Sequence, residues 1–187
     1  DRTRRRKACP VREHLAQELR AILKAAGMSF DNVVSSKVFI TDNAKFQEMN
    51  EVYRTYFTKD PPARATVVAP LMGAANLVEI TMTAVSGPKQ VFATPAADGT
   101  PGKPSPLLSS AVKVGNRLYV SGILGNTAAN ATDIEAQTKE ILARVERTMK
   151  LAGFGWADVA DGVVYITDVA NFAAMNKGYQ SVITKDL

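Results

Sequence analysis

The sequence predicts an α+β protein that contains two partial copies of one unit. The strongest observation is internal repetition, because residues 7–61 align without a gap onto residues 133–187, 126 positions later. In each copy, segments with apolar residues at helical spacing flank a segment rich in β-branched residues. An apolar fraction of 46% and a charged fraction of 22% are ordinary for a folded protein and argue against disorder.

The repeat has the length of a small domain and not of a solenoid repeat, which indicates a duplication. The segment "KAAGMSFDNVVSSKVFITDNAKFQEMNEVY" aligns with "KLAGFGWADVADGVVYITDVANFAAMNKGY". Identical pairs include Gly27/Gly153, Asp42/Asp168, Phe46/Phe172, Met49/Met175, Asn50/Asn176 and Tyr53/Tyr179. We expect a first unit over residues 1–88 that lacks its leading strands, and a second over residues 89–187 that lacks its closing strands.

In the first unit, the pattern predicts helix, strand, helix and two strands. An apolar stripe over residues 11–26 predicts the first helix, and Gly27 can end it in the left-handed conformation. The run "VVSSKVFIT" predicts a strand, after which Asp42 can cap a second helix. "ARATVVAPL" and "NLVEITMTAV" predict two further strands joined by a glycine-containing loop.

In the second unit, strands precede the helices. "KQVFAT", "SAVKV" and "RLYVSGI" predict three strands, with a Gly115-Asn116 turn between the last two and a Pro/Gly-rich loop over residues 97–106. Thr132 and Glu135 form a capping-box pattern at the start of a helix that Gly153 can end. "VADGVVYIT", residues 159–167, predicts a strand, and Asp168 can cap the last helix.

Two explanations of the incomplete copies remain open. The chain is either the middle of a longer tandem protein, or strands from residues 91–124 complete the first copy as in a circular permutation. In both cases, another chain or residues outside this sequence must cover the open sheet edges.

Composition excludes several functional classes. The single cysteine, Cys9, excludes an internal disulfide, and the single histidine, His14, leaves little for a catalytic triad or a zinc site. Sparse cysteine fits a reducing compartment, so we expect a cytoplasmic protein. We expect neither a signal peptide nor a membrane span, since no apolar run approaches about 18 residues. Of the net charge of +5, much comes from residues 2–7, which favours a solvated end over a nucleic-acid arm.

Four further motifs of the sequence are "AVKVGNRLYVSG", "VFITD", "PPARATV" and "LVEITMTAV". Their combination resembles the YjgF/RidA family of enamine/imine deaminases, formerly described as endoribonuclease L-PSP or translation inhibitors. The resemblance covers almost the whole chain as two partial copies. It implies a chorismate-mutase-like fold of the bacillus type, with a mixed sheet backed by two helices in each unit. It also implies homo-oligomers, trimers or pseudo-trimers, with clefts between subunits.

The resemblance assigns a site. It implies that Arg64 binds a substrate carboxylate, a task suited to the planar fork of a guanidinium. It implies that Glu79 positions or activates water for attack on an imine carbon. Further pocket positions carried over by the resemblance are Asn50, Thr66, Ser121 and Gly122. Ser121 and Gly122 belong to the second copy, so they reach the cleft of Arg64 only if a neighbouring domain or subunit contributes them.

The implied reaction is hydrolysis of a C=N bond. A 2-iminoacid formed from 2-aminoacrylate yields a 2-ketoacid and ammonia, which requires neither a metal nor a cofactor. Three positions depart from the family pattern: Leu108, Ile123 and Thr81 replace a tyrosine, a glutamine and a second acid. Two alternatives stay open: a non-catalytic ligand-sensing or scaffold module, and an RNA-binding or ribonuclease-like protein.

From periodicity alone, Arg64 and Glu79 also suit surface residues or an ion pair. Strand alternation places Val78, Ile80 and Met82 on one face and Glu79 on the other, toward solvent or a cleft between subunits.

Overall fold

The computed structural model describes residues 10–184 except residue 74, with side chains in the first helix described from Gln17 onward. The basic run at residues 2–7, Cys9 and the side chain of His14 lie outside this description. The elements of the first unit are α1 (Pro10–Ala25), β1 (Val33–Ile40), α2 (Phe46–Tyr53), β2 (Ala63–Val68) and β3 (Val78–Ala84). Those that follow are β4 (Lys89–Phe92), β5 (Ala111–Val114), β6 (Arg117–Val120), α3 (Ile134–Leu151) and α4 (Phe172–Gln180).

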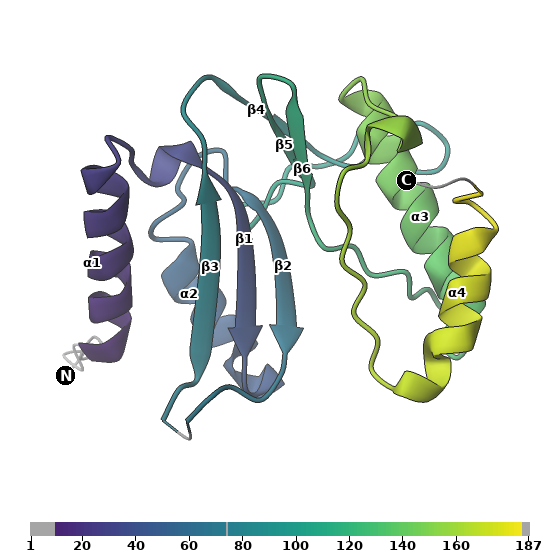
Figure 1. Cartoon of the computed structure of the whole chain (residues 1–187), viewed down its shortest axis with the longest axis horizontal. Helices are drawn as coiled ribbons and strands as arrows, with labels where there is room; N and C mark the ends of the chain where they lie inside the picture. Colours follow the sequence, from purple (N-terminus) through teal and green to yellow (C-terminus); the bar gives the residue numbers. More distant parts are fainter. Residues whose placement is uncertain (1–9, 74, 185–187) are drawn as a thin grey trace, which may run out of the picture.

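The first sheet is mixed, as expected, with strand order β2-β1-β3. The central strand β1 is parallel to β2 and antiparallel to β3. Helix α2 covers one face of this sheet, and α1 stands beside β3 (Figure 1). The main core lies between the helices and the sheet and consists of Leu23, Val33, Val38, Ile40, Met49, Tyr53 and Phe57. This arrangement confirms the predicted α+β class.

The second sheet is an antiparallel meander with strand order β4-β5-β6. Gly115 takes a positive φ of 57° in the turn between β5 and β6, as the sequence predicted. Although this sheet lies in the expected second unit, residues 89–187, it packs against strands of the first unit. Val112 and Val114 of β5 share a buried cluster with Val34 and Ala63.

Helices α3 and α4 pack against each other in the second repeat. Their close approach requires Gly178, because a Cβ there would lie 2.8 Å from the carbonyl oxygen of Glu135. Helix α3 begins one residue later than the predicted capping box. Asp133 is the N-cap, and its carboxylate accepts a hydrogen bond of 2.9 Å from the amide of Ala136. None of the described helices is long and apolar enough to cross a membrane.

The predicted strand at residues 159–167 is wrong. This segment runs extended beside the first sheet without a strand partner among the described residues (Figure 1). Its Tyr165 ring contacts the ring of Phe39 at a centroid distance of 6.5 Å. The physical reason is the absence of pairing partners, since β1 at the corresponding place is hydrogen-bonded on both sides by β2 and β3. Strand propensity alone does not make a strand.

The unpaired segment exposes apolar side chains that are buried in the first repeat. Val164 is 51% exposed and Ile166 is 38% exposed, whereas their counterparts Val38 and Ile40 are both 0% exposed. The same apolar positions of the repeat are therefore buried in the first copy and exposed in the second.

Candidate functional site

Arg64 lies at the start of β2 and is almost completely buried, with 3% of its surface exposed. In the sheet it lies across from Ser36 of β1, which in turn lies across from Met82 of β3. Paired residues on neighbouring strands point to the same face, so the side chain of Arg64 lies on the helix-covered face. The guanidinium carbon lies 4.7 Å from the centroid of the Tyr53 ring, which is in cation–π range.

The polar groups around Arg64 are buried and incompletely paired. Within the described part of the chain, Nε and Nη1 of Arg64 find no hydrogen-bond partner, nor do the two amide atoms of Asn50 or the hydroxyl of Thr66. Asn50 lies one helical turn before Tyr53 on α2, and Thr66 follows Arg64 by two residues on the same face of β2. Buried donors without partners are costly, so this set is suited to a polar ligand.

Burial also shifts the ionisation of this pair. Desolvation lowers the pKa of Arg64, while the neighbouring Tyr53 acts in the opposite direction. Desolvation raises the pKa of Tyr53, against the effects of Ser36 and Arg64. An arginine keeps its proton in proteins, so the site carries a buried positive charge.

The structure brings Ser121 and Gly122 of the second unit to the backbone of Arg64. The Arg64 amide donates to the Ser121 hydroxyl at 2.7 Å, and that hydroxyl donates to the carbonyl of Ser109 at 2.6 Å. The Gly122 amide donates to the carbonyl of Arg64 at 3.1 Å. These bonds join the end of β6 to the start of β2, and they fix the position from which the arginine side chain extends.

Close packing against Ala65 requires glycine at position 122. A Cβ at this position would lie 2.9 Å from the Cβ of Ala65, closer than real contacts allow. The glycine therefore permits β6 to approach β2 at the site.

Replacing Ser121 with alanine should lower the free energy of unfolding by about 1–3 kcal/mol, because it leaves the buried Arg64 amide without its acceptor. Chemical denaturation followed by circular dichroism measures this change. Ser181, whose hydroxyl donates only to the carbonyl of Gly178 within its own helix end, provides a control that should change little. Equal decreases in the free energy of unfolding for the Ser121 and Ser181 variants would show that the hydrogen bonds of Ser121 add no particular stability.

Glu79 lies on the other face of the sheet. Glu79 pairs with Phe39 of β1, whereas Arg64 pairs with Ser36, three positions earlier on the same strand. Residues separated by an odd number of positions on a strand point to opposite faces of the sheet. Its side chain is exposed, and the alternating burial of β3 follows the predicted pattern. The described chain therefore assembles Arg64, Ser121 and Gly122 but leaves Glu79 on the far side of its own sheet.

The contact of Tyr53 with Arg64 was not anticipated from the sequence. Tyr53 belongs to a helical stripe with Phe46 and Met49, and core packing accounts for such a stripe. The sequence signal for this contact was the spacing of three residues between Asn50 and Tyr53, which places both side chains on one face of the helix. Over the described residues, no group of three His, Cys, Asp or Glu side chains gathers as metal ligands would.

Comparisons with known proteins identify the family. A family model described as Endoribonuclease L-PSP matches the chain twice, over residues 10–86 and 102–187. The chain belongs to this family, and the resemblance seen in the sequence is confirmed.

Curated relatives match parts of the chain. Protein DfrA of Myxococcus xanthus is 45% identical over 40% of this chain and 56% of its own length. The 2-iminobutanoate/2-iminopropanoate deaminase of Mus musculus is 43% identical over 38% of this chain and 53% of its own length. The chain thus spans about half the length of the curated relatives it matches.

A solved structure supports the fold over most of the chain. A chorismatase crystal structure matches with a TM-score of 0.56 at 11% identity, covering 91% of this chain and 61% of the chorismatase chain. At this identity the likeness concerns the fold alone. It agrees with the predicted chorismate-mutase-like, duplicated α+β architecture.

Proposed function

We propose that the chain binds a small 2-imino or 2-keto acid at Arg64 and hydrolyses 2-aminoacrylate-type intermediates to 2-ketoacid and ammonia. The observation that carries this proposal is the buried guanidinium, which has two nitrogen atoms without partners in the described chain. A carboxylate would accept their hydrogen bonds and neutralise the charge. The name of the deaminase from Mus musculus supports the reaction type.

In the proposed reaction, water adds to the carbon of the C=N bond and gives a tetrahedral carbinolamine. The amine then leaves as ammonia while the former water oxygen becomes the carbonyl oxygen, so no electrons are gained or lost. Arg64 would hold the carboxylate, and the partnerless groups of Asn50 and Thr66 would orient the ligand. Glu79 would position the water or move a proton.

The position of Glu79 sets a condition for this mechanism. Because the sheet separates it from Arg64 of the same chain, an Arg64/Glu79 pair requires Glu79 from a second copy. Assembly into a homo-oligomer, a trimer or pseudo-trimer with clefts between subunits, is therefore part of the proposal.

The test is release of 2-ketoacid from an enamine generated in place by a PLP-dependent dehydratase. The wild-type protein should accelerate this step, and Arg64→Ala should reduce kcat/KM at least about 100-fold, as for loss of a charged bidentate contact. Arg64→Lys should recover little, because lysine lacks the planar fork. The exposed Arg117 serves as the control, and Arg117→Ala should keep full activity. Undiminished activity of Arg64→Ala would refute the assignment.

A second candidate function is ligand binding without turnover. The observation that favours it is the location of Glu79. In a single chain, Arg64 can bind a carboxylate, but Glu79 lies on the opposite face of the sheet and cannot act on that ligand. Calorimetric binding of 2-ketobutyrate without product formation from the enamine would support this candidate.

Mixing two inactive variants separates the candidates. If Glu79 acts from a second copy, a mixture of Arg64→Ala and Glu79→Ala chains regains part of the activity that each variant alone lacks. No recovery after unfolding and joint refolding would argue against a shared site.

A further inference from the structure

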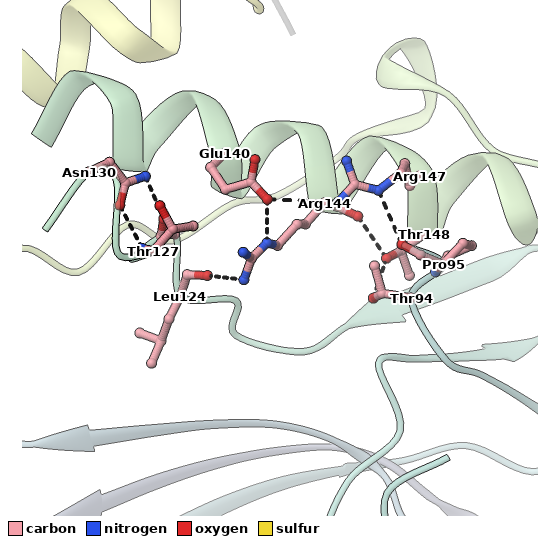
Figure 2. A network of polar contacts seen from close by, with 10 residues as sticks. Thr94, Pro95, Leu124, Thr127, Asn130, Glu140, Arg144, Arg147 and Thr148 are labelled. Atoms are coloured by element: carbon pink, nitrogen blue, oxygen red, sulfur yellow. Dashed lines mark hydrogen bonds and ion pairs between the residues drawn. The ribbon is translucent and has the colours of Figure 1, made fainter. Parts of the chain in front are cut away.

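A polar pocket is lined by residues distant in sequence from Arg64. It is a hollow of about 370 Å³ between the loop at Thr94–Ala97 and one face of α3. The helix contributes Glu140, Arg144 and Arg147 to its wall. Figure 2 shows Arg147 extending to Pro95 of this loop, while Arg144 extends to Glu140 and to the carbonyl of Leu124.

The two guanidiniums are held in place from the rim. Arg144 donates through Nε to the Glu140 carboxylate at 2.6 Å and through Nη1 to the Leu124 carbonyl at 2.9 Å. Arg147 donates through Nε to the Pro95 carbonyl at 3.2 Å. Each guanidinium is thus anchored by part of its donor set, which lowers the entropy lost when a ligand binds the remaining N–H groups.

The loop opposite the arginines is itself fixed to the helix. The hydroxyls of Thr94 and Thr148 are hydrogen-bonded at 2.7 Å, and Thr148 also donates to the carbonyl of Arg144 at 2.8 Å (Figure 2). Both walls of the pocket are therefore defined before any ligand arrives.

The charges in the pocket do not balance. Glu140 pairs closely with Arg144, but the nearest approach of its Oε1 to Arg147 is 3.9 Å, to Nη2. One carboxylate thus serves two cations, and the pocket wall has an excess of one positive charge. The Arg144 and Arg147 side chains are 32% and 25% exposed, so water screens this excess only partly.

We propose that this pocket binds the oxyanion of a small ligand, a phosphate or a carboxylate, between Arg144 and Arg147. The N–H edges of guanidiniums match such oxygens in geometry, and the bonds are charge-assisted. The volume is at the small end of ligand pockets, which favours a compact anion or the anionic end of a larger molecule. The site is independent of Arg64 and of the reaction proposed there.

Glu140 provides a specific test of the proposal. Its carboxylate competes with the ligand for the same guanidiniums, so Glu140→Gln should tighten binding of the anion about two- to fivefold, the size expected for one partly exposed charge. Glutamine keeps a hydrogen-bond acceptor beside Arg144, so this variant should retain the local structure. On the same helix, Glu146 pairs with Lys150 at 3.0 Å outside the pocket wall, and Glu146→Gln is the matched control.

The experiment is titration calorimetry of the whole chain with inorganic phosphate and, separately, with malonate. We expect saturable binding of at least one, loss of about ten- to hundredfold in affinity in Arg147→Ala, and the gain in Glu140→Gln but not in Glu146→Gln. Binding of one anion alone identifies the ligand chemistry. Because malonate is a carboxylate that Arg64 would also bind, the malonate titration is repeated with Arg64→Ala, and the binding that remains is assigned to this pocket. Arg117→Ala, at an exposed arginine outside the pocket wall, should leave the binding of phosphate unchanged.

Two results would overturn the proposal. One is no saturable binding of either anion at millimolar concentration. The other is an affinity that is the same in wild type and Glu140→Gln, which remains decisive even if Arg147→Ala does not fold.

Discussion

Replacing Arg64 with methionine is expected to raise the free energy of unfolding of the unliganded protein by about 1–3 kcal/mol. Arg64 is 3% exposed, and its Nε and Nη1 lack partners within the described residues. Replacing a buried ion pair by apolar residues of similar volume is often stabilising by about 1–4 kcal/mol, and methionine likewise removes the desolvation cost of this buried cation. Loss of the cation–π contact with Tyr53 offsets part of the gain.

Urea denaturation followed by the fluorescence of Trp156, the single tryptophan, measures this effect. The exposed Arg117 is the control, and Arg117→Met should change stability by no more than about 0.5 kcal/mol. The stabilised Arg64→Met variant should at the same time lose binding of a carboxylate ligand, because stability and function oppose each other at such a site. A clear loss of stability would mean that the guanidinium is well satisfied in the empty protein.

Ile40→Ala should lower the free energy of unfolding by about 2–5 kcal/mol, whereas Ile166→Ala should change it by about 0.5 kcal/mol or less. The two isoleucines occupy the same position of the repeat. Ile40 is 0% exposed in the core between β1 and the helices, while Ile166 is 38% exposed on the unpaired segment. The difference measures what pairing and burial of this sequence contribute.

Each variant is the control for the other, since the mutation and its place in the repeat are the same. Denaturation of both variants at low protein concentration gives the comparison. Similar large losses at both positions would contradict the structure and indicate that residues 159–167 are covered in solution.

Local sequence signals predicted most of the fold because they describe local physics. The helical stripes, the glycines that end helices and the Gly115-Asn116 turn all depend on near neighbours, and the structure has them where expected. Gly27 and Gly153 take φ values of 68° and 82°, the left-handed conformation predicted for both. The predicted N-cap of α3 was wrong by one residue. Thr132 and Asp133 are both residue types that cap helices, and in the structure Asp133 is the N-cap.

The strand at residues 159–167 could not be judged from its own residues. Whether such a segment forms a strand depends on hydrogen-bond partners far away in sequence, and β2 and β3 supply these partners only to β1. The sequence comparison of the two copies showed that these strands are not repeated.

For the candidate site, the motifs led to Arg64 and to its dependence on Ser121 and Gly122 from the other repeat. Strand alternation also gave the face of Glu79. The sequence did not reveal that this face is opposite to that of Arg64, because that conclusion needs the register between β1, β2 and β3. The role of Tyr53 was hidden for a similar reason, since a core position and a contact to a buried cation have the same spacing.

The exposed segment has a consequence for how the protein behaves at high concentration. Residues 162–167 read "GVVYIT", a six-residue stretch of high β propensity without charge or proline. Such stretches form cross-β contacts between molecules when their backbone groups are unpaired. Asp161 and Asp168 border the stretch on both sides and act as charged gatekeepers that oppose stacking. We therefore expect these two carboxylates to oppose aggregation through the unpaired segment at high protein concentration.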